Sequence, residues 1–341
     1  MSLVLLLLAL TGGAVAKKKA NSFASCEEIT ASDALFIVDL QNDFMEPFPV
    51  PNPDKQKPNY DISKNLDDDG KIMAGSLAVD GSSEIVEPIN AWISYFLKHG
   101  GKIFASLDWH KVDFVLKRQS KGSKQTVKEG RGKITAPSVA MAQRRPTRPG
   151  TSHMEGCVAL CRSKADYRRG SLMQWPDHCV MQRFGSRFQP FLKIPGDAVV
   201  VKKGWDPLRD TYSAFGGTES KEKYPFDMED TMANLEARNS LEELLTQHNI
   251  TRFWTVGLAL DFCVGGTLLD ALGRNNDTQR PRPPTVGNAI LIQPCTRAVS
   301  PSTTGKAYLE KIRKAGGIIT DKITPESAIK DVCSRTCSFE E

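Results

Sequence analysis

Cys263 stands where a strand-like stretch meets a helix-like stretch, a position from which a thiol can act as a nucleophile. An apolar run of β-branched and aromatic residues that ends at Gly257 predicts a buried strand, while Val264, Leu268 and Leu272 have helical spacing. A cysteine on the turn between them would lie at a helix N-terminus, where unpaired N–H groups favour a thiolate and can bind an oxyanion. The alternative is a buried core thiol, the ordinary role of a free cysteine.

Two charged residues end other apolar runs and are candidate partners for this thiol. Asp39 lies at the end of the run 34–40, and Lys203 follows the run 198–202. Continuous apolar runs are typical of strands buried on both faces of a parallel sheet, and ligands bind at the carboxyl ends of such strands. A turn aspartate and a surface lysine are the alternatives. The common position of Asp39, Lys203 and Cys263 at strand ends favours a shared site.

A metal site is indicated by Asp108 and His110, which follow the apolar run 102–107, and by His178. Side chains two residues apart on a strand point the same way, so Asp108 and His110 can bind one ion. One carboxylate and two imidazoles leave open positions for water or substrate. The chain has five histidines, and the other three are interpreted as helix-end or insertion residues: His99, His153 and His248.

The elements that must position these residues alternate between strand and helix. The pattern predicts one doubly wound, mainly parallel α/β sheet with helices on both faces. Two surface insertions, at about 46–72 and 111–173, lack apolar periodicity. The expected strands are 34–40, 102–107, 198–202, 252–257, 285–293 and 318–320, and the expected helices are 82–98, 240–248, 307–314 and one beginning at Val264.

Several motifs together resemble the nicotinamidases of the cysteine (isochorismatase-like) hydrolase family. They occur in the family order across about residues 33–320, interrupted by the two insertions. The motifs are Val38-Asp-Leu-Gln-Asn-Asp-Phe44, Asp108-Trp-His110, Trp175-Pro-Asp-His-Cys179, Lys203-Gly204, Tyr212-Ser-Ala-Phe215 and Gly257-Leu-Ala-Leu-Asp-Phe-Cys-Val264.

The resemblance implies roles for the residues that match. Asp39, Lys203 and Cys263 would form a catalytic triad, in which Asp39 takes the thiol proton and Lys203 keeps Asp39 ionised. N–H groups near Ala259 and Cys263 would form the oxyanion hole, after a cis peptide at Leu258–Ala259. Phe44, Trp175 and Tyr212 would line a pocket for a flat ring. The set Asp108, His110 and His178 would hold one divalent metal ion, with zinc expected and iron or manganese as alternatives.

The implied activity is conversion of nicotinamide to nicotinic acid and ammonia through a cysteine thioester, feeding NAD salvage. Two alternatives stay open: a related hydrolase acting on another small amide such as pyrazinamide or an N-carbamoyl compound, and a secreted non-catalytic binding protein. Many family members have a further histidine soon after the Asp-x-His motif, and residues 111–116 contain none.

The N-terminus predicts export. Residues 1–16 form an apolar stretch, too short to span a bilayer, that ends in the small-x-small pattern of a signal peptide cleavage site. A basic n-region is lacking, so a weak anchor is the alternative. Residues 17–32 would form an N-terminal segment before the hydrolase domain at 33–341. We expect a secreted protein with no membrane association after signal removal.

Two sequons, at Asn249 and Asn276, fit a secreted glycoprotein. Besides Cys263, seven cysteines are available for disulfides whose connectivity is left open: Cys26, Cys157, Cys161, Cys179, Cys295, Cys333 and Cys337. The formal charge is +5, and the basic stretch 111–169 is interpreted as a solvated insertion, so no nucleic-acid partner is expected. A homo-oligomer is left open.

Overall fold

The structure is a computed structural model that describes residues 28–110, 175, 177–205, 211–221, 235–274 and 284–336. The predicted signal peptide, most of the segment 17–32, the whole of the insertion 111–173 and the Asn276 sequon lie outside these residues. No helix in the described part of the chain is long and apolar enough to span a bilayer.

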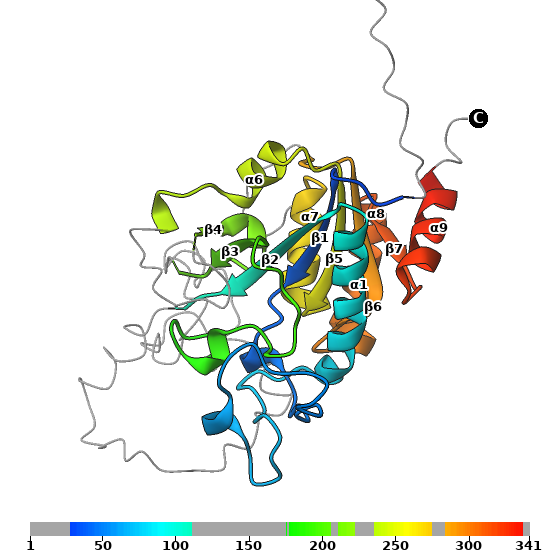
Figure 1. The fold of residues 1–341 in the computed structure, drawn as a ribbon. Helices are drawn as coiled ribbons and strands as arrows, with labels where there is room; N and C mark the ends of the chain where they lie inside the picture. The colour runs from blue at the N-terminus through cyan, green and yellow to red at the C-terminus, as the bar shows by residue number, and fades with distance from the viewer. Residues whose placement is uncertain are drawn as a thin grey trace, which may run out of the picture.

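Within the described residues, one seven-stranded sheet has the order β4-β3-β2-β1-β5-β6-β7 (Figure 1). All neighbours pair in parallel except β3 and β4, which are antiparallel. The doubly wound, mainly parallel sheet predicted from the sequence is therefore confirmed. The strands are β1 (Asp33–Val38), β2 (Lys102–Asp108), β3 (Val199–Lys203), β4 (Thr218–Ser220), β5 (Arg252–Leu258), β6 (Asn288–Arg297) and β7 (Ile318–Thr320).

Helices cover both faces of the sheet, because its central strands are apolar on both sides. In β1, Leu35 and Ile37 face a core shared with α1 and α9, while Ala34 and Phe36 face a core shared with α6, α7 and α8. The helices are α1 (Val86–Lys98), α6 (Leu241–Gln247), α7 (Gly265–Ala271), α8 (Lys306–Lys314) and α9 (Pro325–Thr336). The capping box expected at the start of α6 is present: Glu243 N donates to Ser240 Oγ at 3.3 Å and Ser240 N donates to Glu243 Oε2 at 2.7 Å.

Residues 46–72, interpreted from composition as a surface insertion, are held against the body by three apolar side chains. Phe48, Ile62 and Ile72 are buried in the α1 core. The backbone of Phe48 pairs with that of Ile72, with N–O distances of 3.1 and 2.9 Å. The segment is therefore anchored at both ends while most of its polar side chains face solvent.

Gly257 allows β5 to pass close to β1 just before the site. Its φ is +110°, and a Cβ built there would stand 2.1 Å from the carbonyl oxygen of Val38. The β1–β5 register pairs Val38 with Gly257 directly. Only glycine fits this approach, which brings the ends of the two strands, and hence Asp39 and the Cys263 turn, together.

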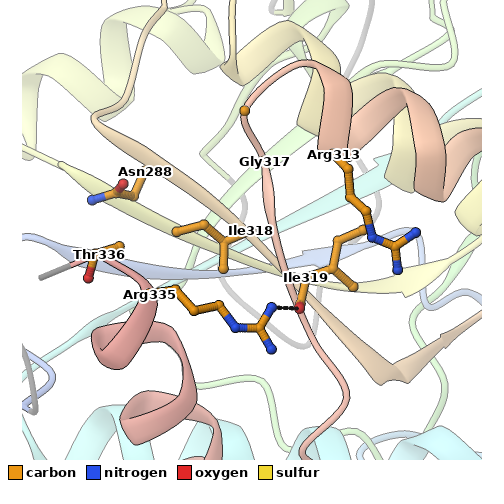
Figure 2. A pocket seen from close by; sticks show the side chains of 8 residues that line it. Asn288, Arg313, Gly317, Ile318, Ile319, Arg335 and Thr336 are labelled. Atoms are coloured by element: carbon orange, nitrogen blue, oxygen red, sulfur yellow. Dashed lines mark hydrogen bonds between the residues drawn. The ribbon is translucent and has the colours of Figure 1, made fainter. Parts of the chain in front are cut away.

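A surface pocket of about 440 Å³ lies at the opposite, amino-terminal edge of the sheet, where β6 and β7 begin (Figure 2). Arg335 crosses it to donate to Ile319 O at 2.9 Å and also pairs with Asp331 at 2.7 Å. Among the residues that the structure describes, its lining contains no carboxylate, histidine or cysteine. The lining residues are Asn288, Arg313, Gly316, Gly317, Ile318, Ile319, Arg335 and Thr336.

Candidate active site

The turn after β5 carries Cys263, as the sequence predicted, but it is a π-helical turn, η7 (Leu260–Val264), rather than the first turn of an α-helix. Its first carbonyl, Ala259 O, accepts from Phe262 N at 3.0 Å and Val264 N at 3.1 Å. The peptide bond between Leu258 and Ala259 is cis, as the resemblance implied. Cys263 is 6% exposed, so its thiol faces the protein interior near the strand ends.

Asp39 lies at the end of β1 in a left-handed backbone conformation, with φ +44°. One of its carboxylate oxygens accepts from Ser106 Oγ at 2.6 Å, and the other pairs with Lys203 Nζ at 3.0 Å. Ser106 was missed in the sequence because an isolated serine within an apolar run carries no signal of its own. Its place on β2, two residues before Asp108, puts both side chains on one face of the strand.

Lys203 connects three groups of the site. Its Nζ lies 3.0 Å from Asp39 and 3.4 Å from Cys263 Sγ, and it also donates to Asp108 Oδ1. The β2–β3 register pairs Asp108 with Lys203, which explains the last contact. With 1% exposure, Lys203 is a buried cation between two buried carboxylates. Burial disfavours its charged form, but Asp108 and Asp39 outweigh burial and hold the pKa of Lys203 well above its usual range.

Burial dominates the protonation of the thiol and of its neighbouring carboxyl. It raises the pKa of Cys263 well above the usual range; Lys203 opposes the rise, and Asp39 and Asp108 add to it. Burial likewise raises the pKa of Asp39 against Lys203. Lys203 lowers the pKa of both groups, as its expected role implies, but burial outweighs it, so at Cys263 the thiol is favoured over the thiolate expected from the turn. A carboxyl with a raised pKa can both take and return a proton.

The metal set predicted from spacing is brought together beside this triad. One oxygen of Asp108, Oδ2, lies 3.7 Å from Nε2 of His110 and 3.7 Å from Nε2 of His178, while its other oxygen faces Lys203. The three ligand atoms lie within 4.8 Å of one another and all three residues are buried. Burial opposes ionisation of Asp108, but Lys203 and then His110 hold its pKa well below the usual value.

This set fits a divalent ion. His110 Nδ1 lies 3.2 Å from Gly204 O, so its Nδ1–H faces a carbonyl and its Nε2 is directed to the carboxylate side. Distances of 3.7 Å are too long for hydrogen bonds but suit donors around a shared cation. A carboxylate with two imidazoles is a donor set for zinc, iron or manganese.

Gln41 fixes the backbone of the carboxylate ligand and was not singled out from the sequence. Its Nε2 donates to Asp108 O at 2.8 Å, and its Oε1 accepts from Asp108 N at 2.8 Å. This paired contact spans 67 residues of sequence, so no local pattern indicates it. It holds the end of β2 against the segment that follows Asp39.

Aromatic side chains gather around Phe262, the residue before Cys263. Of the three predicted pocket residues, Trp175 and Tyr212 are joined by a hydrogen bond from Trp175 Nε1 to the Tyr212 hydroxyl at 3.1 Å. Phe262 contacts both, with ring centroids 5.0 Å from Trp175 and 5.2 Å from Tyr212. The third, Phe44, lies 5.5 Å from the His178 ring. Phe262 was missed because it was interpreted only as part of the cysteine motif.

The protein is an α/β protein with a mainly parallel sheet and with a buried cysteine, carboxylate and lysine at the carboxyl ends of its strands. Residues 33–324 match the isochorismatase domain, so the chain belongs to the isochorismatase family. It is similar to the nicotinamidase of Escherichia coli (strain K12), 28% identical over 239 residues, 70% of this chain and 76% of that protein. The nicotinamidase of Saccharomyces cerevisiae (strain ATCC 204508 / S288c) is 24% identical over 241 residues, 70% of this chain and 80% of that protein. The solved pyrazinamidase of Pyrococcus horikoshii in complex with zinc aligns with a TM-score of 0.47 at 20% identity, covering 85% of this chain and 99% of that chain.

Proposed function

We propose that this protein is a nicotinamidase, which hydrolyses nicotinamide to nicotinic acid and ammonia and so supplies the recycling of the pyridine ring into NAD. The observation that carries the proposal is the position of Lys203 Nζ, 3.4 Å from the Cys263 sulfur and 3.0 Å from the Asp39 carboxylate. A thiol, a carboxylate and an amine in one buried cluster support the proposed roles of nucleophile, base and cation. The similarity to two curated nicotinamidases over 70% of the chain supports the same activity.

In the proposed reaction, Asp39 takes the proton of the Cys263 thiol as the sulfur attacks the carboxamide carbon. The carbonyl oxygen becomes an oxyanion, which N–H groups at Ala259 and Cys263 would bind; losing one such donor costs about 3 kcal/mol of barrier. The C–N bond breaks, and the amide nitrogen leaves as ammonia with the proton that Asp39 returns. Asp39 then takes a proton from water, which attacks the thioester carbon. Nicotinic acid leaves and the thiol is restored.

Asp108, His110 and His178 would hold a divalent ion, and we propose zinc, with iron or manganese as alternatives. When bound, such an ion offers a Lewis-acidic position for the pyridine nitrogen of the substrate. The aromatic residues Trp175 and Tyr212, together with Phe262, would pack against the flat ring. Orientation of the carboxamide over the sulfur accounts for a large part of the rate in such a site.

The test is ammonia release from nicotinamide, pyrazinamide and benzamide, each with and without a chelator. We expect turnover of the two azine amides, weaker turnover of benzamide, and loss of activity with chelator. Equal rates for benzamide and nicotinamide would remove the orienting role of the metal, and turnover confined to another small amide would favour the alternative hydrolase.

The matched variants for this test are Cys263→Ala and Cys295→Ala. Both cysteines are free and buried, but Cys295 lies in β6. Cys263→Ala should retain bound metal and release no ammonia, whereas Cys295→Ala should stay active. Undiminished ammonia release by Cys263→Ala would rule out the thioester route, and inactivity of the wild type towards all three amides would favour a binding protein.

We also propose that the protein is exported and carries a glycan at Asn249. This asparagine is exposed in the turn between α6 and β5, and Thr251 of the same sequon is exposed as well. Cys333 is disulfide-bonded, which suits an oxidising compartment. Expression in a secreting eukaryotic host, followed by glycosidase treatment, should shift the mass of the wild type. The same treatment of an Asn249→Gln variant should give a smaller shift or none.

A further inference from the structure

Asp261, two residues before the proposed nucleophile, is buried and accepts hydrogen bonds from a separate segment of the chain. It is 2% exposed. Its Oδ1 accepts from Val299 N at 2.9 Å, and its Oδ2 accepts from Ser300 N at 2.9 Å and from Thr304 Oγ1 at 2.5 Å. All three donors lie in the segment 299–304 that follows β6, so one side chain joins two strand ends.

The donor segment is held by hydrogen bonds within itself. Residues Pro301–Gly305 form the π-helical turn η8, and Ser300 O accepts from Thr303 N at 3.2 Å and Gly305 N at 2.9 Å. Because this segment has a fixed conformation, its hydrogen bonds hold the Asp261 carboxylate in a defined place. The two peptide N–H donors reach different oxygens of Asp261, so both oxygens must be acceptors.

The position of Asp261 in η7 links this contact to the thiol. Side chains two residues apart in a helical turn point to different sides, so Asp261 can hold the back of the turn while Cys263 faces Lys203. A shift of about 1 Å at a reacting atom can lower a rate on the order of 100-fold. The turn also carries the N–H groups assigned to the oxyanion, so its placement affects both the attack and the charge that follows.

We propose that Asp261 is a positioning residue: its carboxylate fixes the η7 turn against residues 299–304 and thereby sets the place of the Cys263 sulfur and the oxyanion donors. This inference rests on the proposed hydrolysis, in which Cys263 is the nucleophile. Within the described part of the chain, the hydrogen bonds of the Asp261 carboxylate go to Val299, Ser300 and Thr304 and not to the triad or the aromatic residues. Its loss should therefore act on the chemical step more than on substrate binding.

The variant Asp261→Asn keeps the shape but presents an NH₂ group to one of the buried N–H donors. We expect kcat per titratable Cys263 thiol to fall on the order of ten- to 100-fold, with KM changed by less than about threefold. Alkylation of Cys263 by iodoacetamide, followed by peptide mass spectrometry well below the unfolding temperature, should slow by about tenfold. Metal content should be unchanged.

Asp33→Asn is the matched control for stability. Asp33 is a fully buried carboxylate that accepts from Thr30 N at 2.8 Å and Trp254 Nε1 at 2.9 Å, but it lies at the amino end of β1, away from the site. It should lower the unfolding temperature and leave both the kcat per thiol and the alkylation rate of Cys263 unchanged. This control therefore tests whether a loss of stability alone changes the kcat per thiol or the alkylation rate of Cys263.

The inference is overturned if Asp261→Asn alkylates and turns over at the wild-type rate per thiol. Should this variant fail to fold, Thr304→Val decides the matter, because it removes one of the three donors; about a threefold slower alkylation supports the inference and an unchanged rate overturns it. If the wild type releases no ammonia from any amide, the proposed function fails, while the alkylation rates still decide the role of Asp261.

Discussion

Replacing Lys203 by methionine removes the cation that two buried carboxylates share. Lys203 is 1% exposed and pairs with Asp39 at 3.0 Å and with Asp108. Methionine fills most of the same volume, so the main change is electrostatic. The variant leaves Asp39 and Asp108 facing each other without a protein cation between them.

The size of the effect follows from burial. Removing one partner of a buried ion pair destabilises a protein by roughly 3–5 kcal/mol, because the remaining charge has lost its compensation. For a domain of this size that corresponds to a fall in unfolding temperature on the order of 10 °C. The carboxyls then have raised pKa values in the folded state, so the folded variant binds more protons than the unfolded chain and its stability falls as pH rises. The loss of stability relative to the wild type should therefore be larger at about pH 8 than at about pH 5.

The assay is thermal unfolding of apo protein at both pH values, with Lys322→Met as the control. Lys322 pairs with Asp321 at the same 3.0 Å, but the side chains are 49% and 73% exposed. An exposed pair contributes about 0–1 kcal/mol, so this variant should unfold close to the wild type. Equal unfolding temperatures for the two variants would refute the reasoning, and so would a deficit for Lys203→Met that is independent of pH.

Gly257→Ala should destabilise the protein by more than about 3 kcal/mol and reduce ammonia release, because the new Cβ meets Val38 O at 2.1 Å and β1 must move. Gly100→Ala, at φ +79° with nothing within 4 Å of the new Cβ, should cost only about 1 kcal/mol in urea melts, and a similar loss in both would contradict the steric argument. Partial burial and Lys102 lower the pKa of His248, so stability should fall as pH drops through about 6.5, and His248→Gln should flatten this slope. An unflattened slope would assign the dependence to other groups. His178→Ala should reduce metal content measured by elemental analysis, and full retention would exclude this ligand.

Six of the seven strands of the described sheet could be predicted because their sequences are continuous apolar runs, and α6 could be predicted because Ser240 and Glu243 form a capping box. Two elements were missed. β4 (Thr218–Ser220) has three polar residues and is defined by its long-range pairing with β3, so it carries no periodic signal. α9 carried a usable signal, Pro325 at its start and Ala328, Ile329 and Val332 on one face, and this was overlooked.

Site residues that end a strand could be predicted from the sequence. Contacts between site residues that are distant in the sequence could not. Asp39 and Lys203 are examples of the first kind. The contact between Lys203 and Asp108 depends on the β2–β3 register, and the contact of Asp261 with Ser300 spans 39 residues. Protonation could not be predicted either, since the raised pKa of Cys263 arises from its burial in the folded chain.

The order of the strands places segments that are far apart in the sequence side by side in the sheet. β1 pairs with β2 on one side and with β5 on the other, and Asp33 reaches Arg252 across 219 residues. Closing a loop costs free energy that grows only with the logarithm of its length, about 0.6 kcal/mol per doubling. The long segment between β2 and β3 therefore adds little to the cost of forming the sheet. Long-range pairing of this kind slows folding, however, so recovery of activity after denaturation should follow the joining of β1 to β5 rather than the formation of helices.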